Sequence, residues 1–128
     1  MVNDIVDYPL DNFLKLITDL LVSMGYGGGR KQTQTNLKII DNNKIIVEGV
    51  INEDILGFRK IYLQARQSRD IISKIEVEDF MKKLNDCNAE NGVFITTSDF
   101  ENKKYNEIKN IRLINGVELI NLISEYGT

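Results

Sequence analysis

The stretch IYLQARQ, residues 61–67, begins like a buried strand and ends with polar side chains. Ile61, Tyr62 and Leu63 are residue types that pack well on a pleated sheet. Because side chains alternate along a strand, Gln64 and Arg66 point to the same face. Two interpretations are open: the strand leaves the core and enters water, or both side chains point into a site.

The surrounding sequence predicts alternating helices and strands. Apolar residues either recur at helical spacing or fill the short runs that are typical of strands. The predicted helices cover residues 10–24, 75–87, 101–110 and 117–126. The predicted strands cover residues 44–51, 59–66, 92–98 and 111–114. Residues 30–37 are polar, and we expect a loop or a weak edge strand there.

The connections between these segments predict a mixed sheet. Asn52, Asp54 and Gly57 favour a turn, so the first two strands should form an antiparallel hairpin. Later strands are joined through helices, which makes neighbouring strands parallel. We therefore expect a single α/β domain over residues 1–128, with a mixed central β-sheet flanked by helices on both faces. The expected core residues are Phe13, Ile17, Leu20, Leu21, Ile46, Ile61, Leu63, Phe80, Leu84, Val93, Ile95, Leu119 and Ile123.

Composition excludes several kinds of chemistry. The chain contains no histidine, which removes His-based catalytic triads and imidazole metal sites. Its single cysteine, Cys87, fits a reducing compartment. There is no signal peptide and no apolar run of membrane-spanning length, so we expect a cytoplasmic protein without membrane contact. Carboxylates, amides and hydroxyls remain as metal ligands, and these suit a hard cation such as Mg²⁺.

Four blocks of the sequence resemble the catalytic domain of Mrr-type restriction endonucleases. They are LLVSMGYGG (20–28), EGVINEDILGFRKIYLQAR (48–66), GVFITTSDF (92–100) and LINGVELINLISEYG (113–127). The blocks occur in the family's order and spacing, and the likeness covers nearly the whole chain. The resemblance implies a restriction-endonuclease-like fold of the PD-(D/E)xK nuclease superfamily, and a role in the restriction of modified foreign DNA.

The resemblance also implies a catalytic site formed by Glu48, Gln64 and Arg66. Glu48 stands where the family has a metal-binding aspartate, Gln64 matches the family's glutamine, and Arg66 replaces the catalytic lysine. In such a site a carboxylate holds Mg²⁺ on the scissile phosphate, and an amine lies near the attacking water. The implied roles are a metal ligand for Glu48, positioning of metal or water for Gln64, and charge stabilisation for Arg66.

Two of these residues depart from the family pattern in ways that favour a weakened or inactive nuclease. Glu48 is one methylene longer than aspartate, and Mg²⁺ sites tolerate such shifts poorly. Arg66 keeps the positive charge but cannot lose a proton. Leu14 also stands where the family often has a glutamate. The chain is therefore either a Mg²⁺-dependent DNA endonuclease or a non-catalytic DNA-binding or protein-interaction module, acting as a homodimer or with a partner nuclease subunit.

Contact with DNA would depend on a local group of positive residues. The net charge of −3 gives no overall attraction to a polyanion. The candidates for DNA contact are Arg30, Lys31, Arg66, Arg69, Lys103 and Lys104. Lys82 and Lys83 are predicted to lie on a helix face away from the site. The alternative for Glu48, which shares its strand face with Lys44 and Asn52, is a solvated surface position.

Overall fold

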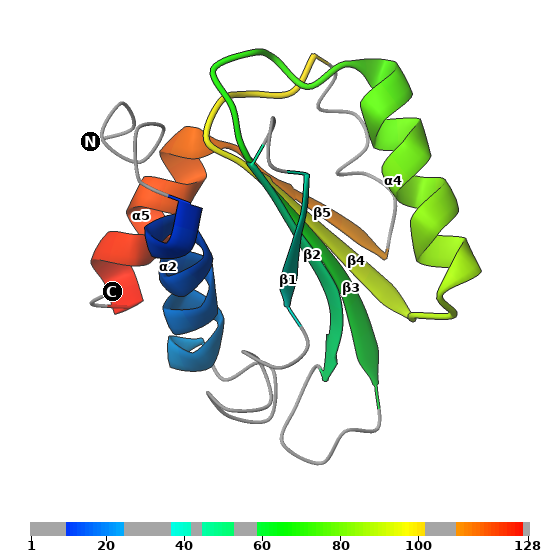
Figure 1. Ribbon diagram of the computed structural model, residues 1–128, viewed down its shortest axis with the longest axis horizontal. Coiled ribbons are helices and arrows are strands. Elements are labelled where there is room, and N and C mark those ends of the chain that lie inside the picture. The colour runs from blue at the N-terminus through cyan, green and yellow to red at the C-terminus, as the bar shows by residue number, and fades with distance from the viewer. Residues whose placement is uncertain (1–9, 25–36, 42–44, 53–58, 102–109, 127–128) are drawn as a thin grey trace.

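The computed structural model describes residues 10–24, 37–41, 45–52, 59–101 and 110–126. These residues form a five-stranded sheet and three helices (Figure 1). The helices are α2 (Leu10–Ser23), α4 (Lys74–Asp86) and α5 (Gly116–Tyr126). The strands are β1 (Lys38–Asp41), β2 (Ile45–Asn52), β3 (Lys60–Gln67), β4 (Asn91–Thr96) and β5 (Ile111–Ile114).

The strand order confirms the predicted mixed sheet. The five strands are arranged in chain order, and the pairs β1–β2 and β2–β3 are antiparallel. Strand β4 runs parallel to both β3 and β5. The helix α4 makes the crossover from β3 to β4, which explains why this pair is parallel. The antiparallel and parallel halves therefore meet at β3, the strand that contains residues 61–67.

One strand was missed by the sequence prediction, and one predicted helix lies largely outside the described residues. The edge strand β1 lies just after the polar residues 30–37, and no strand was predicted at its position. Its four residues are too few to establish a period of two from sequence. The helix predicted at 101–110 falls almost entirely on residues outside the described ranges, and so do residues 30–36.

Helices cover both faces of the sheet, as predicted. Figure 1 shows α2 and α5 together on one face and α4 alone on the other. Two hydrophobic clusters correspond to these two faces, one beneath α2 and α5 and one beneath α4. The predicted core residues are buried, except that Val93 is partly buried against the cluster beneath α2 and α5. No helix within the described ranges is long and apolar enough to cross a membrane.

Aromatic rings dominate the packing beneath α4. Phe80 of α4 stacks on Tyr62 of β3, with ring centroids 5.3 Å apart, and lies 4.9 Å from the ring of Phe94 of β4. The inward side of the helix is formed by Val77, Phe80 and Leu84, which follow helical spacing. Ile75, in the first turn of α4, is 76% exposed and takes no part in this packing.

Candidate functional site

The alternation along β2 and β3 places the predicted catalytic residues on the face that α4 covers. Glu48 lies directly opposite Gln64 in the β2–β3 register, and Gln64 is in turn beside Phe94 of β4. Gln64 is only 1% exposed, and the side chain of Arg66 is 13% exposed. The strand therefore does not run out into water. Its amide and guanidinium groups point into the space beneath α4.

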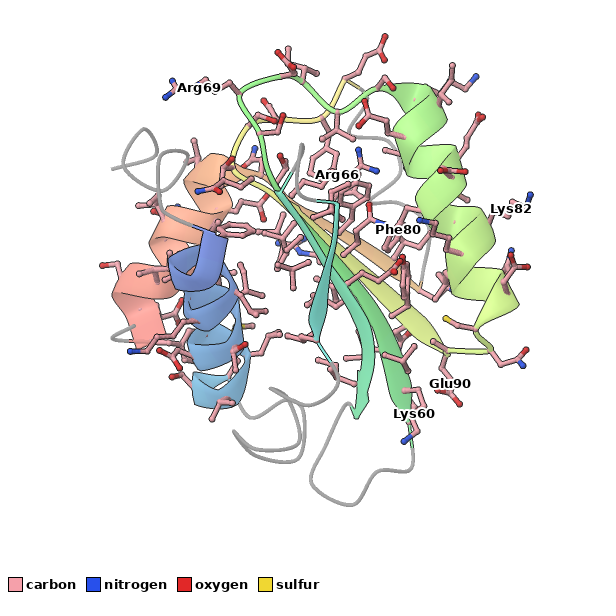
Figure 2. All side chains as sticks on the ribbon, viewed as in Figure 1. Lys60, Arg66, Arg69, Phe80, Lys82 and Glu90 are labelled. Atoms are coloured by element: carbon pink, nitrogen blue, oxygen red, sulfur yellow. The ribbon has the colours of Figure 1, made fainter. Side chains whose placement is uncertain are left out.

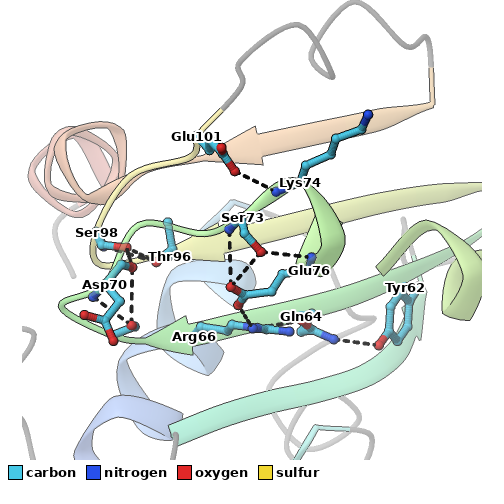
Figure 3. Close-up of polar contacts among 11 residues, drawn as sticks. Tyr62, Gln64, Arg66, Asp70, Ser73, Lys74, Glu76, Thr96, Ser98 and Glu101 are labelled. Carbon is cyan, nitrogen blue, oxygen red and sulfur yellow. Dashed lines mark hydrogen bonds and ion pairs between the residues drawn. The ribbon is translucent and has the colours of Figure 1, made fainter. Parts of the chain in front are cut away.

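Four side chains form a continuous hydrogen-bonded line that we call the polar row: Glu48, Tyr62, Gln64 and Arg66. The Tyr62 hydroxyl donates to Glu48 Oε1 and accepts a hydrogen bond of 3.1 Å from Gln64 Nε2. Gln64 Oε1 accepts from Arg66 Nε at 3.0 Å (Figure 3). Each group fixes the orientation of the next, because the amide of Gln64 has its donor end on Tyr62 and its acceptor end on Arg66.

Burial keeps the central tyrosine of the row in its protonated form. Tyr62 is 3% exposed, and this burial raises the pKa of its hydroxyl above the ordinary value. The hydrogen bond to the Glu48 carboxylate raises the pKa further, because a negative charge next to it disfavours a phenolate. Tyr62 is therefore a donor to Glu48 at neutral pH. The sequence alone indicates no role for Tyr62 beyond that of a strand residue.

Arg66 is held by groups from three elements. Its Nη1 donates to Glu76 Oε2 on the first turn of α4, and its guanidinium lies over the ring of Phe94, with Cζ 5.2 Å from the centroid. Together with Gln64 on its own strand, these contacts hold the guanidinium on three sides. Arg66 thus lies beside Gln64, another predicted catalytic residue, but its side chain is already paired within the protein.

Glu76 has a second function at the start of α4. It forms a capping box with Ser73, in which Ser73 Oγ accepts from the Glu76 amide at 3.4 Å and Glu76 Oε1 accepts from the Ser73 amide at 3.3 Å (Figure 3). The Ser73–Glu76 spacing is a sequence signature of a helix start. That signature locates the helix, but it contains no information about the ion pair with Arg66.

Lys83 also belongs to this site, which corrects the predicted placement. Its Nζ lies 3.8 Å from Glu48 Oε1, with 45% of the Lys83 side chain and 20% of the Glu48 side chain exposed. Lys83 comes immediately before the buried Leu84 and three residues after Phe80, so it lies at the edge of the face that α4 turns to the sheet. Lys82 projects from the outer side of α4 (Figure 2). The prediction is therefore wrong for Lys83 and right for Lys82.

An open pocket of about 460 Å³ lies beside the polar row. The sheet contributes Glu48, Gly49, Val50 and Tyr62, and the last turns of α4 contribute Lys83, Asp86 and Cys87. Lys83 and two carboxylates therefore border the same opening. Glu48 is thus neither fully buried nor a plain surface residue, because its carboxylate is bonded to Tyr62 and borders a space that a ligand can enter.

The polar row does not fit a Mg²⁺ ion in this arrangement. Hard cations bind several oxygen ligands, and the row has one carboxylate, Glu48. Glu48 Oε1 faces the Tyr62 hydroxyl and the Lys83 ammonium, while Gln64 Oε1 faces Arg66. Within the part of the chain that the structure describes, no three acidic, cysteine or histidine side chains are grouped closely enough to hold a metal ion.

Of the remaining predicted DNA-contact residues, the structure describes Arg69, which does not join the polar row. Arg69 is exposed on the loop after β3, and Figure 2 shows it projecting away from Arg66. This loop is fixed to the end of β4, since Thr97 Oγ1 donates to the Ser68 carbonyl at 2.8 Å and Ser98 Oγ donates to the Asp70 carbonyl at 2.6 Å. Four other predicted contact residues lie outside the described ranges: Arg30, Lys31, Lys103 and Lys104.

The mixed sheet with helices on both faces, and with Glu48 beside the sequence Gln64–Ala65–Arg66 on the next strand, defines a restriction-endonuclease-like domain. The chain belongs to the restriction endonuclease family of Mrr type, whose catalytic-domain profile matches residues 7–123. The resemblance seen in the sequence is therefore confirmed.

One relative supports this assignment, and one solved structure has a similar fold. The chain is 30% identical over 132 residues to the type IV methyl-directed restriction enzyme EcoKMrr of Escherichia coli (strain K12), and the match includes 94% of this chain and 42% of the relative. The fold is similar to that of the DNA modification-dependent restriction endonuclease AspBHI, with a TM-score of 0.53 and 14% identity. That match covers 91% of this chain and 31% of the other. The chain thus spans less than half the length of either protein.

Proposed function

We propose that this domain acts on DNA, with the phosphodiester backbone lying at the open pocket where the Glu48 end of the polar row is accessible. The observation that carries the proposal is the side-by-side placement of Glu48 and Gln64 on adjacent strands, facing the same helix. EcoKMrr is a methyl-directed restriction enzyme, and AspBHI, whose fold is similar, is a DNA modification-dependent restriction endonuclease. Both descriptions support DNA as the substrate. The implied roles are Glu48 as metal ligand, Gln64 in positioning metal or water, and Arg66 as positive charge.

We further propose that cleavage requires Mg²⁺ and is weak, because the polar row in the described arrangement does not fit the ion. The row supplies one carboxylate, and that carboxylate is bonded to Tyr62 and lies near a lysine ammonium. Arg66 cannot act as a base, and its guanidinium is paired with Glu76. The expected nuclease activity is therefore low, because Glu48 is bonded within the protein and Arg66 cannot accept a proton.

The same contacts favour a second candidate function. The polar groups of the row satisfy one another within the protein, which is the arrangement expected of a structural network in a non-catalytic nuclease-fold module. Such a module would bind DNA or a protein partner, either as a homodimer or beside an active nuclease subunit.

A plasmid-nicking assay separates the two candidates. The wild-type protein is incubated with supercoiled DNA and Mg²⁺ or Mn²⁺, in parallel with Glu48→Ala and with Glu78→Ala. Glu78 is an exposed acidic residue of α4, so it controls for the loss of one negative charge. Metal-dependent nicking by the wild type and by Glu78→Ala, but not by Glu48→Ala, supports the nuclease. The absence of nicking by all three proteins supports the non-catalytic module.

A gain-of-function variant tests the cause of the weak activity. The double substitution Glu48→Asp with Arg66→Lys restores the residue types of the family at both positions. We expect nicking at least about tenfold faster than that of the wild type, since catalytic groups in their proper geometry contribute about 10²-fold or more. Equal rates for the two proteins would show that these two residues are not what limits the activity.

A further inference from the structure

We propose that Lys83 of α4, rather than Arg66 of β3, makes the direct contact with a DNA phosphate at this site. The inference rests on the proposed function, because it names the residue that binds the proposed substrate. It arises from a difference between the two cations. Arg66 is paired with groups of the protein itself, whereas Lys83 borders the open pocket.

Arg66 is poorly placed to bind phosphate. A guanidinium recognises a phosphate best with two parallel N–H groups. Arg66 Nε already donates to Gln64, Nη1 donates to Glu76, and the plane of the group lies over the Phe94 ring. A phosphate that reached Arg66 would compete with the Glu76 carboxylate and would have to enter a region where the arginine side chain is only 13% exposed. The contacts show Arg66 joining β3 to the start of α4.

Lys83 has the opposite properties. Its side chain is 45% exposed and borders the pocket together with Glu48 and Tyr62. An ion pair at this exposure is weak, so a phosphate can compete for the ammonium at little cost. An ammonium also carries three N–H donors, so one can remain directed at Glu48 while another contacts a phosphate oxygen.

The charges around the pocket make Lys83 favourable for the approach of DNA. Glu48 and Asp86 are both acidic and border the same opening. Without Lys83, a phosphate entering the pocket would meet these two carboxylates and no compensating charge from α4. We therefore expect removal of Lys83 to weaken binding more than the loss of an equal charge elsewhere on the helix.

The neighbouring residue provides the matched control. Lys82 has the same side chain and lies on the same helix, but it projects from the outer face (Figure 2). Lys83→Ala and Lys82→Ala change the net charge equally, so any difference between them reflects position. Lys83→Arg keeps the positive charge at the pocket and serves as the conservative variant.

The experiment is a DNA-binding titration of the whole chain across a range of salt concentrations. Binding of a labelled duplex is measured by fluorescence anisotropy from about 50 to about 200 mM salt. We expect Lys83→Ala to lower affinity several-fold and to reduce the slope of log K against log salt by about one unit, because one phosphate contact is lost. Lys82→Ala and Lys83→Arg should keep the wild-type slope.

The possible failures are distinguishable. If the wild type binds but Lys83→Ala keeps its salt slope, or if Lys82→Ala lowers the slope equally, then Lys83 is not the phosphate contact and the proposed function still stands. If the wild type shows no binding at low salt, the proposed function itself fails and the inference falls with it. A role for Lys83 in stability alone would lower affinity without changing the slope.

Discussion

Replacing Glu76 by glutamine should separate the charge of this residue from its role at the start of α4. Glutamine also serves at this position of a capping box, so the hydrogen bonds to Ser73 can remain. The change removes the negative partner of Arg66, whose side chain is 13% exposed, against 33% for Glu76. A mostly buried guanidinium is then left without its carboxylate.

The expected loss in the free energy of unfolding on Glu76→Gln lies between two limits. Exposed ion pairs contribute up to about 1 kcal/mol, whereas removing one partner of a fully buried pair costs about 3–5 kcal/mol. The Arg66–Glu76 pair is shielded on the arginine side and partly open on the glutamate side. We therefore expect Glu76→Gln to lower the free energy of unfolding by about 1–2 kcal/mol.

The control is Glu78→Gln on the same helix. Glu78 pairs with Lys74 at 3.9 Å, and both side chains are more than half exposed. Loss of such a pair should cost only about 0.3–0.5 kcal/mol. Urea unfolding followed by circular dichroism compares the two variants. Equal losses of stability would refute the conclusion that Glu76 holds Arg66 in place.

Three further predictions concern the face beneath α4. Because burial raises the pKa of Tyr62 above 10.0, the unfolded chain loses this proton first as the pH rises, so the stability of the wild type should fall by up to about 1.4 kcal/mol per pH unit above about pH 10. Tyr62→Phe should remove that part of the decline in urea titrations across this range, and an unchanged decline would contradict the raised pKa. Gly92→Ala would bring a methyl group to 2.9 Å from Phe80 Cζ and 3.0 Å from Leu84 Cδ2, and thermal unfolding should show a loss of about 1–3 kcal/mol. Ile75→Ser should change stability by less than about 0.5 kcal/mol because Ile75 is 76% exposed; a loss above about 2 kcal/mol would mean that Ile75 is buried after all.

The positions and directions of most strands could be predicted from the sequence, because strand alternation and turn residues are local signals. Strands β2, β3, β4 and β5 lie within two residues of their predicted bounds, and the hairpin and crossovers give the predicted directions. The strand β1 was missed because four residues give too little pattern.

For the site, the sequence determined which residues share a face, and the tertiary structure decided what each residue can do. The period of two along β2 and β3, with the family resemblance, was enough to select Glu48, Gln64 and Arg66. Glu76 and Lys83 were missed because they reach the row from α4, and helix-to-sheet contacts depend on how the helix is rotated and placed over the strands. The pairing of Arg66 and the exposure of Lys83 follow from that placement. An ion pair depends on the distance between two groups in the folded chain, and this distance cannot be read from their separation in the sequence.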